Sequence, residues 1–220
     1  MNRVLPSMAI LGAACALFTA TTSCRAEDAE KRDDPNVVAL LSHFSSGGII
    51  TTDSEGFVDS VLVFSAEKCL PHLKGLTRLK TLRIADGTKA NWTHLRGLTS
   101  LETLAIIPLK TDVHIGISDT DLVNLKDMTR LKMLGMMNTE ITDAGLQHLR
   151  PLRNLESLTL MHCRVTDAGL DTIKKLPKLK ILGLQHTQVT NVAVAELQKS
   201  RPNLKIGFVP DDPDDAETER

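Results

Sequence analysis

Aromatic residues are scarce in this sequence. Of 220 residues, 3% are aromatic, with one Trp and no Tyr, while the hydrophobic share is 42%. The core must therefore be built from Leu, Ile, Val and Met, which favours many small and equivalent layers. Proteins that bind single-stranded nucleic acid stack its bases on aromatic side chains. The shortage thus argues against nucleic acid as a partner.

Cysteines and catalytic motifs are also sparse. Cys69 and Cys163 lie far apart in the body of the chain, which provides neither a disulfide framework nor a metal-binding spacing. We expect both to be buried thiols. The sequence has no G-x-S-x-G, H-E-x-x-H or paired C-x-x-C motif and no phosphate-binding glycine loop. These absences predict a protein without catalytic activity and without a cofactor.

The apolar run near the N-terminus is too short to cross a membrane. It covers residues 8–20, whereas a membrane-spanning helix needs about 20 residues. Preceded by Arg3, it is typical of an export signal, which we assign to residues 1–26. Cleavage after Ala26 would release a soluble periplasmic or secreted protein. Cleavage before Cys24 would leave a cysteine for bacterial lipidation and a membrane-anchored lipoprotein.

Acidic residues are concentrated at the two ends of the expected mature chain. Residues 27–34 carry five acidic and two basic side chains, and residues 210–220 carry six acidic and one basic. Such segments cannot bury enough apolar surface to fold. We therefore expect a disordered acidic arm at 27–35 and a disordered acidic tail at 210–220.

A 24-residue repeat dominates the rest of the chain. Its clearest copies begin at Leu131, Leu155 and Leu179, and earlier or incomplete copies predict six to seven turns. The L-x-x-L-x-L half alternates as a strand does. The T-D-A-G-L-x-x-L half predicts a short helix capped by a threonine, with the following aspartate facing the helix dipole. Each turn would be stabilised by stacking on its neighbours.

With its ITDAGL-x-x-L segments, the chain resembles the leucine-rich-repeat family over residues 57–209. The resemblance is to the type common in bacterial exported proteins, akin to the cysteine-containing repeats of F-box adaptors. It implies an α/β solenoid with a parallel sheet on the concave face, short helices on the convex face and ligand binding on the concave sheet. No F-box-like module precedes the repeats, although a substrate-adaptor relative remains an alternative.

Two segments depart from the repeat. Residues 36–56 are expected to form an N-terminal cap, with a helix at Pro35–Phe44 and a turn at 47–55. The segment Pro108–Ile117 contains an insertion of six residues relative to the later repeats. Loops tolerate insertions where a surface is used or unconstrained, and the sequence assigns this one no role.

Aligned repeats place equivalent residues in columns on the expected sheet. One column alternates in charge and predicts a ladder of ion pairs: Asp59, Lys80, Glu102, Lys132, Glu156 and Lys180. A second column is apolar on the side open to a partner, with polar residues at the strand exits. We predict that these residues bind the partner: Phe64, Ile107, Met133, Met137, Asn138, Met161, His162, Gln185 and His186. A metal at His162 and His186 is disfavoured, because zinc needs three or four ligands.

The leading hypothesis is a monomeric, non-catalytic module of the cell envelope or exterior that binds a protein or peptide on its concave face. A contact with the membrane is expected only through lipidation of Cys24. The alternative is a lipid-anchored spacer of the envelope without a discrete ligand.

Intact-mass analysis of the mature protein distinguishes the two forms. A chain that begins at Glu27 is the expected product of simple secretion. A diacyl or triacyl adduct on Cys24 would contradict secretion and support the anchored form.

Overall fold

The computed structural model describes residues 48–108, 110 and 113–209. The expected export signal, acidic arm, capping helix at Pro35–Phe44 and acidic tail lie outside the described residues.

The strands form a single eight-stranded sheet in chain order. Strands β2 to β8 are parallel and pair without a shift at the L-x-L positions, whereas β1 runs antiparallel to β2. The strands are β1 Gly48–Thr52, β2 Val58–Val63, β3 Thr81–Ile84, β4 Thr103–Ile106, β5 Met133–Thr142, β6 Ser157–Arg164, β7 Ile181–Gly183 and β8 Lys205–Gly207.

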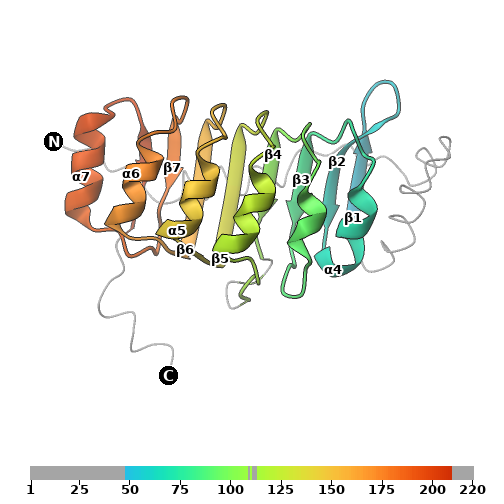
Figure 1. Ribbon diagram of the computed structural model, residues 1–220, viewed down its shortest axis with the longest axis horizontal. Helices are drawn as coiled ribbons and strands as arrows, with labels where there is room; N and C mark the ends of the chain where they lie inside the picture. The colour runs from blue at the N-terminus through green and yellow to red at the C-terminus, as the bar shows by residue number, and fades with distance from the viewer. Residues whose placement is uncertain (1–47, 109, 111–112, 210–220) are drawn as a thin grey trace.

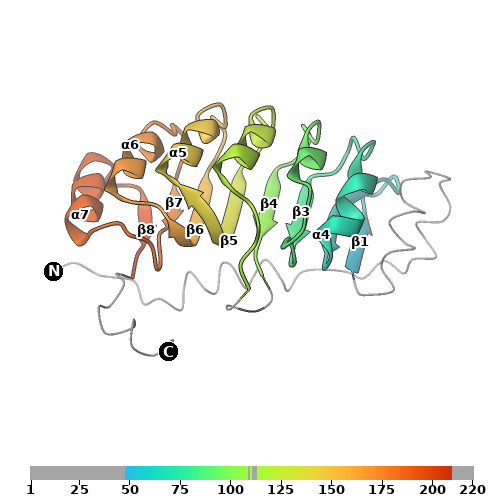
Figure 2. The same cartoon turned by 60° about the horizontal axis from the view of Figure 1, so that its bottom comes forward.

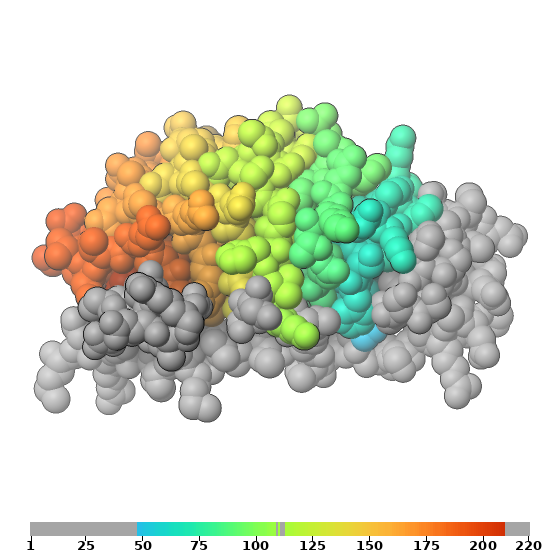
Figure 3. Space-filling view, turned by 90° about the horizontal axis from the view of Figure 1, so that it is seen from below, coloured from blue at the N-terminus to red at the C-terminus, as the bar shows by residue number. Residues whose placement is uncertain are grey.

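Short helical segments cover one face of this sheet. Figures 1 and 2 show them side by side on the convex face, with the sheet on the concave side. They are α4 Ala66–Cys69, η2 Leu70–Leu73, η3 Trp92–Leu95, η4 Asp119–Leu125, α5 Asp143–Leu146, η5 Gln147–Leu149, η6 Asp167–Gly169, α6 Leu170–Ile173 and α7 Asn191–Ser200. In Figure 3, which looks at the edge where the strands end, the segments follow one another in chain order. The architecture is the leucine-rich-repeat solenoid expected from the repeat.

The turn expected at residues 47–55 is wrong in its first half. Gly48–Thr52 forms strand β1, and the chain turns between Asp53 and Phe57. The β-branched run Ile49–Thr52 has high strand propensity. By pairing with β2, it covers the edge at which the parallel sheet begins.

The strands β2 to β7 and the residues just after them contribute two rows of inward side chains to the core, which also contains the leucines of the helical segments. No residue of the two rows is more than 1% exposed, and full burial of one such side chain is worth about 1.5–3 kcal/mol. The rows are Val61, Leu82, Leu104, Leu134, Leu158 and Leu182, and Val63, Ile84, Ile106, Met136, Leu160 and Leu184.

The insertion returns to the core at its C-terminal end. Ile115 and Ile117 are fully buried, and the Ile115 N–H donates to the carbonyl of Asn138 at 2.8 Å. Trp92 fills a core leucine position, and its indole N–H donates to the carbonyl of Gly116 at 2.9 Å. The indole thus ties the insertion to the preceding turn.

Neighbouring turns are also joined by aspartate–threonine hydrogen bonds. The Asp143 carboxylate accepts the Thr166 backbone N–H at 2.9 Å and its hydroxyl at 2.6 Å. The pairs Asp119 with Thr142 and Asp167 with Thr190 repeat this pattern. The threonines cap their own helical segments as expected. The aspartates lie in the first turn as expected, but their carboxylates hold the next turn of the solenoid.

The charge ladder is confirmed in part. Glu102 pairs with Lys132 at 2.7 Å, and Glu156 pairs with Lys180 at 2.6 Å. The hydrogen bond from Lys132 lowers the pKa of the Glu102 carboxyl. Because all four side chains are largely exposed, the pairs contribute little to stability. Their main effect is to keep like charges apart along the column.

Substitution of Gly169 by Ala should lower the free energy of unfolding by about 1–3 kcal/mol. A Cβ at this position would overlap the Asp143 carboxylate and stand 2.8 Å from Cγ1 of Val165. The φ of −64° is helical, so helix propensity alone would favour Ala by about 1 kcal/mol. Packing is expected to reverse that sign in urea-unfolding measurements.

Gly135→Ala is the matched control. The nearest atom to a Cβ there is Cδ1 of Ile107 at 3.8 Å, so this variant should unfold at the same urea concentration as the parent or a higher one. Equal stability of the Gly169 and Gly135 variants would contradict the packing argument.

Candidate functional site

The strand register builds three outward columns on the concave face. The first contains Met133, Ser157 and Ile181, and the second contains Gly135, Thr159 and Gly183. In the third column Met137 lies beside Met161. Because the register does not shift over these positions, the columns predicted from the aligned repeats are real rows on the sheet.

The predicted site residues differ in their access to a partner. Phe64, Ile107, Met133 and Met137 are half-buried, and Ile181 beside them is 38% exposed. Met161 and Gln185, in the third column, are buried. The sheet therefore offers apolar atoms of several side chains without a large protruding hydrophobic group.

Asn138, His162 and His186 form the strand-exit column with one shared backbone conformation. Their φ values are 52°, 50° and 53°, which lie in the left-handed region. Asn and His are among the residue types enriched there. The imidazole rings of His162 and His186 are stacked, with centroids 4.3 Å apart and planes within 8°. His162 is exposed, His186 is half-buried and Asn138 is buried.

Two polar groups of the concave face lack hydrogen bonds to the described residues. They are Nε of Arg83 and Oε1 of Gln185, both buried atoms. Burial lowers the pKa of the Arg83 guanidinium. Arg83 was not among the residues predicted to bind a partner, because one charge among small residues gives no signal on its own.

A polar row lies behind the strand-exit column. The Thr139 hydroxyl and the Cys163 sulfur are 3.2 Å apart, and the Thr187 hydroxyl donates to the carbonyl of Leu184 at 2.9 Å. Both Cys69 and Cys163 are buried free thiols, as expected. Burial raises the pKa of the Cys163 thiol to about 11. A thiol of this kind remains protonated at neutral pH and is a poor nucleophile.

The described residues contain neither a metal-binding cluster nor a membrane-spanning helix. Among them, no group of three or more His, Cys, Asp or Glu side chains is arranged to hold a metal ion. No helix in this part of the chain is long and apolar enough to cross a membrane.

Comparisons with known proteins found similarity at the level of solved structures. No protein-family model and no curated protein matches the chain. An internalin (inlF) from Listeria monocytogenes is 25% identical, with a TM-score of 0.49, over 64% of this chain and 38% of that one. Internalin C2 (inlC2) of the same organism is 18% identical, with a TM-score of 0.44, over 69% and 81%.

The third structure is the PEPR1–AtPEP1 complex. It is 21% identical with a TM-score of 0.43, over 64% of this chain and 20% of that one. The chain thus spans well under half the length of the matched inlF and PEPR1 chains. The assignment of the fold depends on the repeats and strand register of this chain itself.

The Cys163 thiol should make stability depend on pH in alkaline solution. The pKa of the thiol is 9.0 in the unfolded chain, whereas burial raises the pKa of the folded Cys163 thiol to about 11. The stabilisation is therefore complete below pH 9 and is lost between pH 9 and 11, at about 1.4 kcal/mol per pH unit.

Urea unfolding at pH 8, 9, 10 and 11 measures this loss. Cys163→Ser keeps a hydroxyl beside Thr139, but this hydroxyl does not titrate in this range. The free energy of unfolding of the variant should therefore decline less than that of the parent between pH 8 and 11. An equal loss of unfolding free energy with pH in the parent and in Cys163→Ser would contradict the assignment of this loss to the Cys163 thiol.

Proposed function

We propose that this chain is an exported, non-catalytic module that binds a protein or peptide on the concave face of its solenoid. The central contact surface consists of Phe64 just after β2, Ile107 just after β4, and Met133 and Met137 on β5. Arg83 supplies a cation in the middle of this surface. Asn138, His162 and His186 form its polar rim at the strand exits.

The observation that carries the proposal is the combination of apolar side chains with unsatisfied polar atoms on one face. Buried polar groups normally have hydrogen-bond partners, yet Arg83 Nε and Gln185 Oε1 have none among the described residues. An acidic group of a partner beside an apolar segment could pair with the half-buried guanidinium of Arg83, whereas Gln185 is buried and lies four strands away. Methionine adapts to varied shapes, which suits a contact surface at Met133 and Met137.

The shape of the sheet supports a peptide-sized or protein-sized partner. The concave surface extends across all the turns of the solenoid (Figure 2), so an extended ligand can contact several repeats at once. The described residues supply neither an ionised thiol nor a metal cluster for chemistry. Binding is therefore the activity that this face supports best.

Photo-crosslinking tests the surface in the native host. A crosslinking amino acid at Met137 should give a discrete adduct with one partner protein or peptide, identified by mass spectrometry. The same group at Val192, which is 69% exposed on α7, serves as the control and should give no such adduct. Adding Met133→Lys should reduce the Met137 adduct about tenfold, because a charge would be desolvated in the contact.

Equal adducts from positions 137 and 192 would contradict the site. A Met137 adduct that survives Met133→Lys and Arg83→Gln together would show that neither residue contributes to the contact, which would also contradict the proposed surface.

A further inference from the structure

Basic residues are concentrated in the loops that lead from helical segments into strands. Five such loops of seven residues each precede β3 to β7: residues 74–80, 96–102, 126–132, 150–156 and 174–180. Together they hold thirteen Lys or Arg and three Asp or Glu. The remaining described residues hold eight basic and twelve acidic side chains. The surface of these five loops, here called the basic edge, thus differs in sign from the rest of the solenoid.

The basic edge is exposed and largely uncompensated. Twelve of its thirteen basic side chains are exposed, and Arg78 is half-buried. Four of the thirteen form ion pairs with described carboxylates: Arg78, Lys132, Lys174 and Lys180. The other nine have no carboxylate of the described residues within 4 Å.

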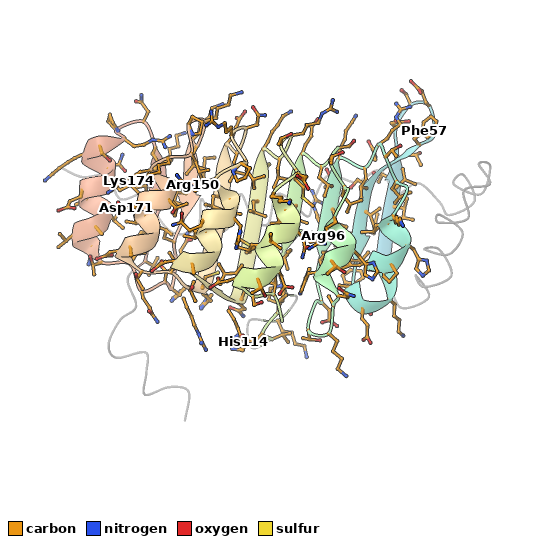
Figure 4. The ribbon with its side chains drawn as sticks, in the orientation of Figure 1. Phe57, Arg96, His114, Arg150, Asp171 and Lys174 are labelled. Carbon is orange, nitrogen blue, oxygen red and sulfur yellow. The ribbon has the colours of Figure 1, made fainter. Side chains whose placement is uncertain are left out.

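One column of the basic edge contains like charges only. Every loop begins with a cation, and these five residues are Lys74, Arg96, Lys126, Arg150 and Lys174. Figure 4 labels three of them, Arg96, Arg150 and Lys174, in order along the solenoid. The neighbouring column at the last loop position alternates in sign and avoids repulsion, so the fold does not require a row of equal charges.

The helix dipole accounts for part of this column, because cations are favoured at helix C-termini. It does not account for the cations further along the loops, at Lys80, Arg130, Arg153 and Lys178. These residues carry the positive charge across the edge from the helix ends to the strand starts. The charge forms a broad band and not a single line.

The residues of the basic edge favour a fluid layer of anionic groups as its binding partner. All ten Leu and Met side chains of the five loops are buried, and the loops contain no aromatic residue on which a nucleic-acid base could stack. A linear polyanion would contact one row of cations, whereas lipid headgroups can gather beneath every cation of a broad edge. Polybasic surfaces bind anionic bilayers in this way, without apolar insertion.

We infer that the basic edge docks the solenoid on the surface of an anionic phospholipid membrane. Of the twelve acidic side chains of the other described residues, three pair with cations of the basic edge: Asp53, Glu55 and Asp171. The remaining nine orient the molecule, since they keep the other surfaces away from the bilayer. The concave sheet lies beside this edge and remains open to a partner. The inference goes beyond the proposed function and does not depend on lipidation of Cys24.

Vesicle co-sedimentation of the full chain tests the docking. Binding to vesicles of phosphatidylcholine with about 30% phosphatidylglycerol is compared with binding to vesicles of pure phosphatidylcholine. The second measurement gives the binding that occurs through apolar segments without anionic lipid. The chain should prefer the anionic vesicles, and the preference should disappear in 0.5 M salt, where the Debye length is about 4 Å.

Two variants with the same net charge locate the contact. The edge variant replaces Lys126, Arg130, Arg153 and Lys175 by Gln, and the control variant replaces Lys68, Lys89, Lys110 and Arg164 by Gln. All eight side chains are exposed. Each Lys or Arg near the surface contributes roughly fivefold to binding, so removal of four should make the edge variant bind anionic vesicles about 600-fold more weakly. The control variant should bind nearly as the parent does.

Thermal unfolding should show that both variants fold as the parent does, because none of the substituted side chains forms a hydrogen bond or ion pair with the described residues. Equal weakening of both variants would overturn the inference, since net charge and not the edge would then control binding. No preference of the parent for anionic vesicles would overturn it as well. Binding to soluble polyglutamate in place of vesicles would identify an acidic polypeptide as the partner of the edge.

Discussion

The unshifted pairing of parallel strands at the L-x-L positions is the constraint on which the other features depend. Backbone hydrogen bonds hold equivalent residues of successive repeats side by side from β2 to β8. Any residue type that recurs with the repeat therefore becomes a row on the molecule. A slip of one residue would turn every inward leucine toward the open face.

The fold followed from the sequence because its signals are periodic. Leucine spacing identified the strands, and threonines such as Thr142 and Thr166 identified the helix starts. The direction of the Asp143 carboxylate did not follow, because local reasoning considers the helix in which a residue lies and not the next turn. Strand β1 was also missed, since it belongs to no repeat and is stabilised by pairing with β2.

The sequence predicted which residues of the candidate site share a column, but not which of their side chains are accessible to a partner. Met137 and Met161 occupy equivalent positions, yet one is half-buried and the other is buried. Exposure depends on the side chains around each residue, which differ between repeats even where the backbone does not. The left-handed backbone conformation of His162 and His186 comes from the turn that brings Cys163 and Thr187 into the interior. The periodicity of the sequence does not predict this conformation.

The aspartate–threonine bonds join the turns between Asp119 and Thr190 in one direction. The threonine of a turn donates to the preceding turn, and the aspartate of the same turn accepts from the following one. Residues 142–165 form a unit of 24 residues. Thr142 at its start donates to Asp119 of the preceding turn, and Asp143 accepts from Thr166 of the following turn. Loss of this unit by recombination would bring Asp119 against Thr166, and duplication would create one more identical junction. Loss or gain of whole turns of this kind therefore leaves the aspartate–threonine bonds of each new junction satisfied.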